Sequence, residues 1–83
     1  MERDAIIIDV RTPGEFKNGH IQGSVNVPLN KLGKSIDKIR KKGKPVITCC
    51  ASGMRSANGA SLLKRSGIDA MNGGAWSSLQ NKI

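Results

Sequence analysis

The chain has 83 residues, with 14 lysines and arginines against 6 acidic residues, which gives a formal net charge of +8. This length predicts one domain, residues 1–83, whose modest core must be mostly aliphatic because Phe16 and Trp76 are its only large aromatic residues. No apolar run approaches the roughly 20 residues of a membrane span, and the charged start at residues 1–4 is unlike a signal peptide. We expect a cytoplasmic protein with no membrane contact, or a periplasmic one from which a signal peptide has been removed.

The first predicted elements are a buried strand, a short helix and a second strand. Residues 5–10, A-I-I-I-D-V, form a continuous apolar run, which is typical of a strand in a parallel sheet covered on both faces. Thr12 and Pro13 predict the start of a helix, with threonine as its cap and proline at its first position. Gly19 ends this helix, and residues 24–27 predict a short second strand.

The most basic part of the chain is residues 31–44, which contain seven basic side chains and one acidic side chain and so carry +6 of the net +8. Apolar residues recur here at helical spacing, which predicts one amphipathic helix that opens at Pro28, ends at Gly43 and turns its lysines to solvent. Aromatic side chains that could stack nucleic-acid bases are missing, so we expect no nucleic acid as a partner. An acidic protein partner stays open. The apolar residues are Leu29, Leu32, Ile36 and Ile39.

A strand, a tight loop and a helix follow, and the chain is organised around them. Residues 46–48 are β-branched and predict a central buried strand, which ends in Cys49 and Cys50. The short stretch A-S-G-M comes next, and a helix is predicted over residues 55–66. Backbone N–H groups in such a loop, together with the positive end of the helix, favour ionised thiols and bound anions. We therefore interpret Cys50 as a nucleophile.

The two cysteines have different predicted roles. Strand alternation sends their side chains to opposite sides of the sheet, so Cys49 is expected to be a small buried apolar residue. A second hypothesis makes Cys49 the thiol that resolves an oxidised or persulfidated Cys50, but adjacent cysteines form only strained disulfides. The pair cannot form a disulfide framework, and it indicates a reducing compartment or a reactive thiol.

Several residues after Cys50 could support its chemistry. Arg55 could hold an anionic substrate through paired hydrogen bonds and favour the thiolate, and because a cation is unfavourable at the positive end of a helix, its presence there indicates function. Gly53 permits backbone angles that other residues resist, whereas Met54 could set substrate preference or be exposed and inert. The predicted loop consists of Ala51, Ser52, Gly53, Met54, Arg55 and Ser56, and its two serines offer hydroxyl groups.

Four polar residues earlier in the chain are predicted to support this loop. Asp9 and Arg11 fall near the end of a strand, where open α/β sheets place their sites. Asp9 could be a catalytic acid. We favour a structural role instead, in which Asp9, Arg11 and Glu15 form hydrogen bonds and ion pairs that hold the loops around the site, because exposed carboxylates beside an arginine usually pair with it. His20 could be a base, although a structural hydrogen bond is commoner for a lone histidine. His20 and the two cysteines would be a poor set of zinc ligands, so we predict that no metal is bound.

The end of the chain predicts a strand at residues 68–71 and an N-G-G turn at residues 72–74. A last helix is predicted at residues 75–80, with Trp76 packed over the core. Together the elements predict an α/β fold, a three-layer α/β/α domain with a mainly parallel sheet of four or five strands and the cysteine loop at the strand ends.

Three stretches of the sequence resemble the rhodanese family of sulfurtransferases. C-A-S-G-M-R-S at residues 50–56 resembles the family's active-site loop, a cysteine followed by four residues and a basic residue. D-V-R-T-P-G-E-F, G-H-I and G-S-V-N-V-P, within residues 9–28, resemble the family's first signature. N-G-G-A-W at residues 72–76 resembles its terminal glycine pair and tryptophan.

The resemblance implies a sulfurtransferase that uses neither a metal nor an organic cofactor. Cys50 would take a sulfur atom from a small anionic donor such as thiosulfate, carry it as a persulfide and pass it to cyanide, a thiol or a protein cysteine. It also implies that the segment around His20 helps to structure the fold. We expect the protein to be a monomer.

Two alternatives remain at this stage. The chain could be a binding module or a sulfur carrier that serves one protein partner, for which the basic segment 31–44 would suit an acidic surface. It could also be a phosphatase or an arsenate reductase. Loops of that kind have five residues between the cysteine and the arginine, whereas four separate Cys50 from Arg55, which favours a sulfur atom over a phosphate group.

Overall fold

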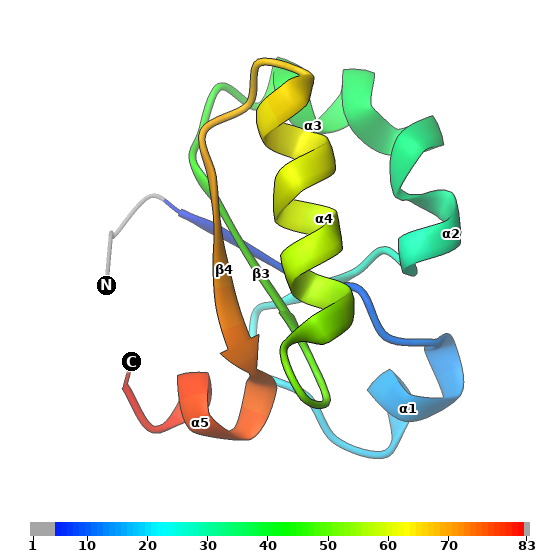
Figure 1. The fold of residues 1–83 in the computed structure, drawn as a ribbon. Helices are drawn as coiled ribbons and strands as arrows, with labels where there is room; N and C mark the ends of the chain where they lie inside the picture. Colours follow the sequence, from blue (N-terminus) through cyan, green and yellow to red (C-terminus); the bar gives the residue numbers. More distant parts are fainter. Residues whose placement is uncertain (1–4, 83) are drawn as a thin grey trace.

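The computed structural model describes residues 5–82 as a four-stranded parallel sheet with the strand order β2-β1-β3-β4 (Figure 1). The central strands are buried because they are almost wholly apolar, as a sheet covered on both faces requires. The predicted α/β class and mainly parallel sheet are confirmed. The strands are β1 (Ile6–Asp9), β2 (Val25–Asn26), β3 (Val46–Cys50) and β4 (Ala70–Ala75).

Helical segments cover both faces of the sheet and complete the three layers. On one face, α4 packs on β3 and β4 with α2 and α3 beside it, and on the other face α5 packs near the end of β4 (Figure 1). In the part of the chain that the structure describes, no helix is long and apolar enough to cross a membrane. The segments are α1 (Pro13–Lys17), α2 (Leu29–Leu32), the 3₁₀ helix η1 (Gly33–Ser35), α3 (Ile36–Lys41), α4 (Met54–Arg65) and α5 (Trp76–Gln80).

The start of α1 has the predicted cap. Thr12 Oγ1 accepts a hydrogen bond from the Glu15 N–H at 3.3 Å, and Glu15 Oε1 accepts one from the Thr12 N–H at 3.0 Å. This reciprocal pair satisfies N–H groups that have no partner inside a helix, and Pro13 at the first helical position needs no such partner. The cap fixes Glu15 at the beginning of α1, on the side of the loop that follows β3.

The basic segment 31–44 does not form the single helix that its periodicity predicts. Residues 29–41 instead form α2, η1 and α3 in succession, because Gly33 is a weak helix former and the backbone of Ser35, with φ −99° and ψ 0°, departs from regular α-helical angles. The apolar positions nevertheless reach the core, since Leu32 and Ile39 are buried. The hydrophobic spacing therefore predicts the buried positions correctly, and the prediction of one continuous helix is wrong.

The predicted N-G-G turn at residues 72–74 is wrong, because these residues continue β4. A Cβ atom on Gly73 would lie 2.7 Å from Ile47 Cγ2 and 2.8 Å from the Thr48 carbonyl oxygen, so glycine allows β4 to approach β3 closely here. The register of the two strands shifts between Thr48 and Cys50, and Gly74 takes a positive φ of 82°. This irregularity carries the end of β4 against the loop that follows Cys50.

Candidate active site

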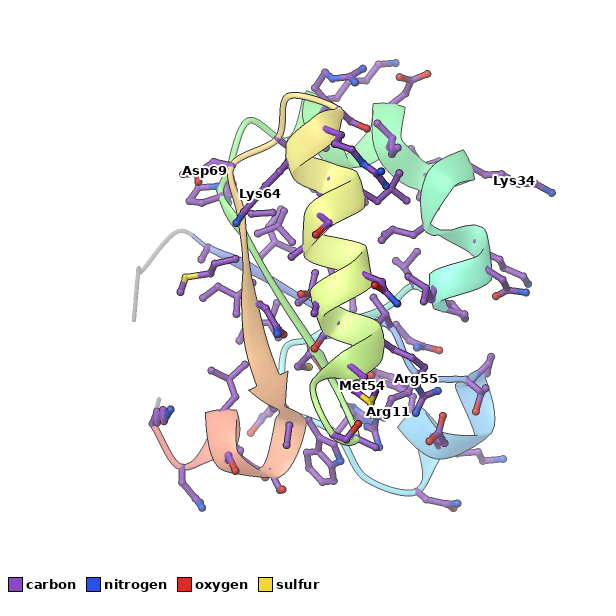
Figure 2. The ribbon with its side chains drawn as sticks, viewed as in Figure 1. Arg11, Lys34, Met54, Arg55, Lys64 and Asp69 are labelled. Carbon is purple, nitrogen blue, oxygen red and sulfur yellow. The ribbon has the colours of Figure 1, made fainter. Side chains whose placement is uncertain are left out.

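The candidate site is the turn between β3 and α4. Cys50 is the last residue of β3, and α4 begins at Met54, as predicted within one residue. Gly53 makes the turn with φ +98°, and a Cβ atom there would lie 3.3 Å from Gly74 Cα. Glycine is therefore needed for both the backbone angle and the close contact. Figure 2 shows Met54, Arg55 and Arg11 gathered at this end of α4.

The sulfur atom of Cys50 is surrounded by hydrogen-bond donors. The N–H groups of Gly53 and Ser56 donate to Sγ at 3.0 Å and 3.3 Å, and Ser56 Oγ lies 3.4 Å from Sγ. Burial alone would raise the pKa of the Cys50 thiol, but hydrogen bonds from the Ser56 side chain and from the backbone of Ser56, Gly53 and Ser52 outweigh it and lower the pKa. The loop thus favours a thiolate at Cys50, as its sequence predicts.

Cys49 has the opposite environment. Its side chain belongs to the apolar cluster on the other face of the sheet, with Ile7, Ile21 and Ile47, whereas Cys50 lies on the α4 side. Desolvation and the negative charge of Asp9 raise the pKa of Cys49 to about 12. Cys49 is therefore a protonated, buried thiol at neutral pH, which agrees with the prediction that it serves as a small apolar residue.

The loop closes over the Cys50 side chain. Cys50 is 0 % exposed, while Met54 is 77 % exposed, and Ala51 and Ser52 also face solvent. Because Cys50 is fully buried, a reagent can reach Sγ only after the groups around it move.

Arg55 is held by Glu15 rather than standing free for an anion. Arg55 Nη1 and Nη2 donate to Glu15 Oε1 and Oε2 at 2.8 Å and 3.0 Å, and both side chains are 38 % exposed. The hydrogen bond from Arg55, with further bonds from Thr12, lowers the pKa of Glu15 to about 2. This pair joins the start of α1 to the start of α4, so an anion near the loop would compete with Glu15 for Arg55.

Asp9 and Arg11 form a buried pair next to the site. Arg11 Nη2 donates to Asp9 Oδ2 at 2.7 Å and to the Gly19 carbonyl oxygen at 2.6 Å, and its guanidinium carbon lies 4.8 Å from the Trp76 ring centre. Asp9 is 0 % exposed, so the expectation of an exposed carboxylate was wrong for this residue. Both carboxylate oxygens of Asp9 are bonded to Arg11, so Asp9 orients the guanidinium that contacts Gly19 and Trp76.

His20 is engaged by neighbours in sequence. Its ring stacks on Phe16 with 3.7 Å between the ring centres, and Nδ1 lies 2.7 Å from the Phe16 carbonyl oxygen. The residue is exposed. These contacts agree with the structural role that we favoured over a catalytic base.

The structure adds Asn72 and Thr48 to the site, and the sequence analysis missed both. Asn72 Oδ1 accepts from the Ser56 hydroxyl, and the Thr48 hydroxyl donates to the Ser56 carbonyl oxygen at 2.7 Å. The turn predicted at residues 72–74 places Asn72 outside the sheet and away from the strand end where the site lies. A polar residue near the carboxyl end of a strand beside β3 is the signal that could have identified it.

Within residues 5–82, no three histidine, cysteine, aspartate or glutamate side chains lie close enough together to hold a metal ion. The candidate site instead consists of one thiol, backbone N–H groups and neutral hydrogen-bonding side chains, with one ion pair beside them. Such an arrangement can stabilise a nucleophilic thiolate and negative charge that develops next to it.

The sequence model of the rhodanese-like domain family matches residues 1–78, and the chain belongs to this family. The uncharacterized protein YqhL of Bacillus subtilis (strain 168) is 43% identical over 65 residues, which cover 78% of this chain and 51% of YqhL. The thiosulfate sulfurtransferase GlpE of Shewanella oneidensis is 33% identical over 75 residues, covering 84% of this chain and 73% of GlpE.

Solved structures agree with this assignment. The structure described as a rhodanese with anions from E. coli has a TM-score of 0.81 and 27% identity, and the match covers 88% of each chain. The chain spans about half the length of YqhL. Fold and family are thus those of rhodanese-like domains, among relatives that include named sulfurtransferases.

Proposed function

We propose that the protein is a sulfurtransferase that moves a sulfur atom from thiosulfate, or a similar small anionic donor, to a thiophilic acceptor through a persulfide on Cys50. The observation that carries this proposal is the position of Cys50 Sγ, which accepts hydrogen bonds from the N–H groups of Gly53 and Ser56 at the end of a parallel strand. GlpE, named a thiosulfate sulfurtransferase, supports the donor class.

The first step forms the persulfide. The Cys50 thiolate attacks the outer sulfur of thiosulfate, the bond between the two sulfur atoms of the donor breaks, and sulfite leaves with the bonding electrons. Cys50 then carries one additional sulfur atom. The N–H groups of Gly53 and Ser56 stabilise the anion before and after the step, because they already point at the position where negative charge resides.

The second step returns the enzyme to its starting state. Cyanide or a thiolate attacks the outer sulfur of the persulfide, takes that sulfur as thiocyanate or as a new persulfide, and leaves the Cys50 thiolate behind. The two half-reactions give ping-pong kinetics. No redox partner is needed, since the sulfur atom moves between two nucleophiles.

Arg55 is the proposed contact for the anionic part of the donor. It lies beside the loop and is half-exposed, but its two terminal nitrogens are bonded to Glu15. A doubly charged donor would share or replace Glu15 as the partner of Arg55. The E. coli neighbour described as a rhodanese with anions supports anion binding by a protein of this fold.

Four residues between Cys50 and Arg55 also favour sulfur over phosphate chemistry, because a loop of five would be wider. A phosphatase or an arsenate reductase therefore stays the less favoured alternative. It predicts release of phosphate or reduction of arsenate with no stable sulfur adduct on Cys50.

A second candidate function is that of a sulfur carrier for one protein partner. The basic segment, residues 31–44, favours it, because all seven of its basic side chains are exposed. The segment runs from α2 through η1 and α3 into the loop before β3. Lys34 extends away from the body of the protein in Figure 2. A carrier would accept sulfur readily from an acidic protein, in a manner weakened by salt, and would turn over free thiosulfate slowly.

Thiocyanate production from thiosulfate and cyanide tests the proposal. We expect turnover with parallel double-reciprocal plots, loss of turnover in Cys50→Ala and retention in Cys49→Ala. Turnover that survives in Cys50→Ala would refute the assigned nucleophile. If wild type shows none, free thiosulfate is not the donor, and salt-sensitive sulfur uptake from a protein would favour the carrier.

A further inference from the structure

The side chain of Asn72 connects β4 to the loop around Cys50. Its Oδ1 accepts hydrogen bonds from the Ser56 hydroxyl at 2.5 Å and from the Gly74 N–H at 2.9 Å, and its Nδ2 donates to the Gly53 carbonyl oxygen at 3.2 Å. These bonds fix the orientation of the carboxamide, because only Oδ1 can accept and only Nδ2 can donate. Asn72 therefore presents a fixed acceptor to Ser56.

The Ser56 hydroxyl has one proton and three acceptors within reach. Its oxygen lies 2.5 Å from Asn72 Oδ1, 3.1 Å from the Gly53 carbonyl oxygen and 3.4 Å from Cys50 Sγ. The shortest contact places the proton toward Asn72, so Ser56 Oγ turns a lone pair to Cys50. In that arrangement Oγ accepts from the Cys50 S–H and stabilises the protonated thiol.

Ionisation of Cys50 reverses what is required of Ser56. A thiolate only accepts, so the hydroxyl must rotate its proton from Oδ1 to Sγ and lose its bond to Asn72. The thiol proton goes to water, and no covalent bond of Ser56 or Asn72 changes. We propose that Asn72 and Cys50 compete for the one proton of Ser56, and that Asn72 is thereby a positioning residue that sets how readily Cys50 ionises.

This proposal rests on the proposed function only in assigning the reactive thiolate to Cys50. Charged and titratable groups near Cys50 come from β1, β3, α1, α4 and the loop after β1, and β4 and α5 contain no titratable residue. A substitution at Asn72 changes none of these groups, so a shift in the pKa of Cys50 in an Asn72 variant is due to the loss of the Asn72 carboxamide. The groups are Asp9, Arg11, Glu15, Cys49 and Arg55.

The test is a pH titration of the thiolate by its ultraviolet absorbance in wild type and Asn72→Leu. Loss of the acceptor frees the Ser56 proton for Sγ, so we expect the pKa of Cys50 to fall by about half a unit to one unit, the equivalent of one neutral hydrogen bond. Cys49 does not interfere, because its pKa of about 12 lies above the range titrated. Asn58→Leu, at an exposed asparagine of α4, is the matched control and should leave the pKa unchanged.

The sign of the shift separates this role from simple loosening of the loop. If Asn72→Leu merely disordered the loop, Sγ would lose its N–H donors and the pKa of Cys50 would rise. Asn72→Asp keeps the acceptor and adds negative charge, so it is expected to raise the pKa, and by more in the presence of the Ser56 hydroxyl than in a Ser56→Ala background. That difference provides the test should the leucine variant not fold. In a Ser56→Ala background, Asn72→Leu should have no effect on the pKa.

Three results would overturn the proposal: an upward or absent shift in folded Asn72→Leu, a shift that persists in Ser56→Ala, or no rise in Asn72→Asp. The titration uses no sulfur donor, so it is independent of thiosulfate chemistry. A downward shift in a protein that forms no persulfide would support the role of Asn72 and reject the donor. An unchanged pKa in a protein that does form the persulfide would reject the role of Asn72 alone.

Discussion

Cys49 and Cys50 are the same residue type one peptide bond apart, yet the fold gives them opposite chemistry. Cys49 faces an apolar cluster, where desolvation raises its pKa to about 12. Cys50 faces the turn into α4, where hydrogen bonds from Ser56 and from backbone N–H groups lower its pKa despite burial. The difference teaches that burial alone does not decide the reactivity of a thiol; the donors that surround the sulfur do.

The largest expected effect is on sulfur transfer. Cys50→Ala should lower thiosulfate turnover by more than about 1000-fold, to the background rate, because it removes the nucleophile itself. Cys49→Ala should retain turnover within a few-fold, since that thiol is protonated and on the other face of the sheet. Steady-state rates on the two variants measure the contrast. Equal losses of turnover in the two variants would contradict the assignment of the nucleophile to Cys50 alone.

The next effect is on stability, at the buried pair beside Cys49. Asp9→Ala leaves the Arg11 guanidinium buried without its carboxylate, so we expect a loss of about 3–5 kcal/mol in the free energy of unfolding, measured by urea denaturation. Asp37→Ala, which breaks the exposed pair with Arg40, is the control and should change stability by less than about 1 kcal/mol. A similar small change in Asp9→Ala would mean that the buried pair does not brace the site.

A further effect, smaller at any one pH unit, is the dependence of stability on the protonation of Cys49. The pKa of Cys49 is raised from 9.0 to about 12 in the folded protein, so the folded state retains a proton that the unfolded chain loses. The resulting stabilisation is complete below pH 9 and is lost as the pH rises toward 12, by about 1.4 kcal/mol per pH unit. The stability of wild type minus that of Cys49→Ala should therefore fall with this slope in alkaline urea titrations. A difference that does not vary with pH would place Cys49 in a more polar environment than its apolar neighbours provide.

The smallest effect concerns the ion pair that holds Arg55. Glu15→Gln removes the negative charge that competes with an anionic donor, so we expect the KM for thiosulfate to fall two- to five-fold with little change in kcat. Asp37→Asn changes the net charge equally at a distant exposed site and should leave the KM unchanged. If Glu15→Gln instead raises the KM, Glu15 positions Arg55 for the donor rather than competing with it.

Much of this arrangement follows from the sequence by short-range rules. The β-branched residues 46–48 predict β3, and strand alternation predicts the opposite faces of the two cysteines that end it. Thr12 followed by Pro13 and Glu15 predicts the capped start of α1. Each prediction depends on residues that are neighbours in sequence. The resemblance to rhodaneses identified the family without any structure.

Apart from the break in the basic helix at Gly33, the features that the sequence did not predict depend on contacts between distant segments. The glycines at 73 and 74 have the composition of a turn, but the packing of β4 on β3 makes them a strand with a shifted register. Once that strand is in place, Asn72 reaches Ser56, which is 16 residues earlier. Arg55 and Glu15 lie 40 residues apart, and no local pattern indicates that they pair.

The most direct test of the central claim, that Cys50 rather than Cys49 carries the sulfur, is intact mass spectrometry after treatment with thiosulfate. We predict that wild type and Cys49→Ala each gain the mass of one sulfur atom, that cyanide removes it, and that Cys50→Ala gains nothing. A sulfur adduct that persists in Cys50→Ala and disappears in Cys49→Ala would contradict the account, because it would place the chemistry on the thiol of the apolar cluster rather than on the sulfur that accepts N–H hydrogen bonds.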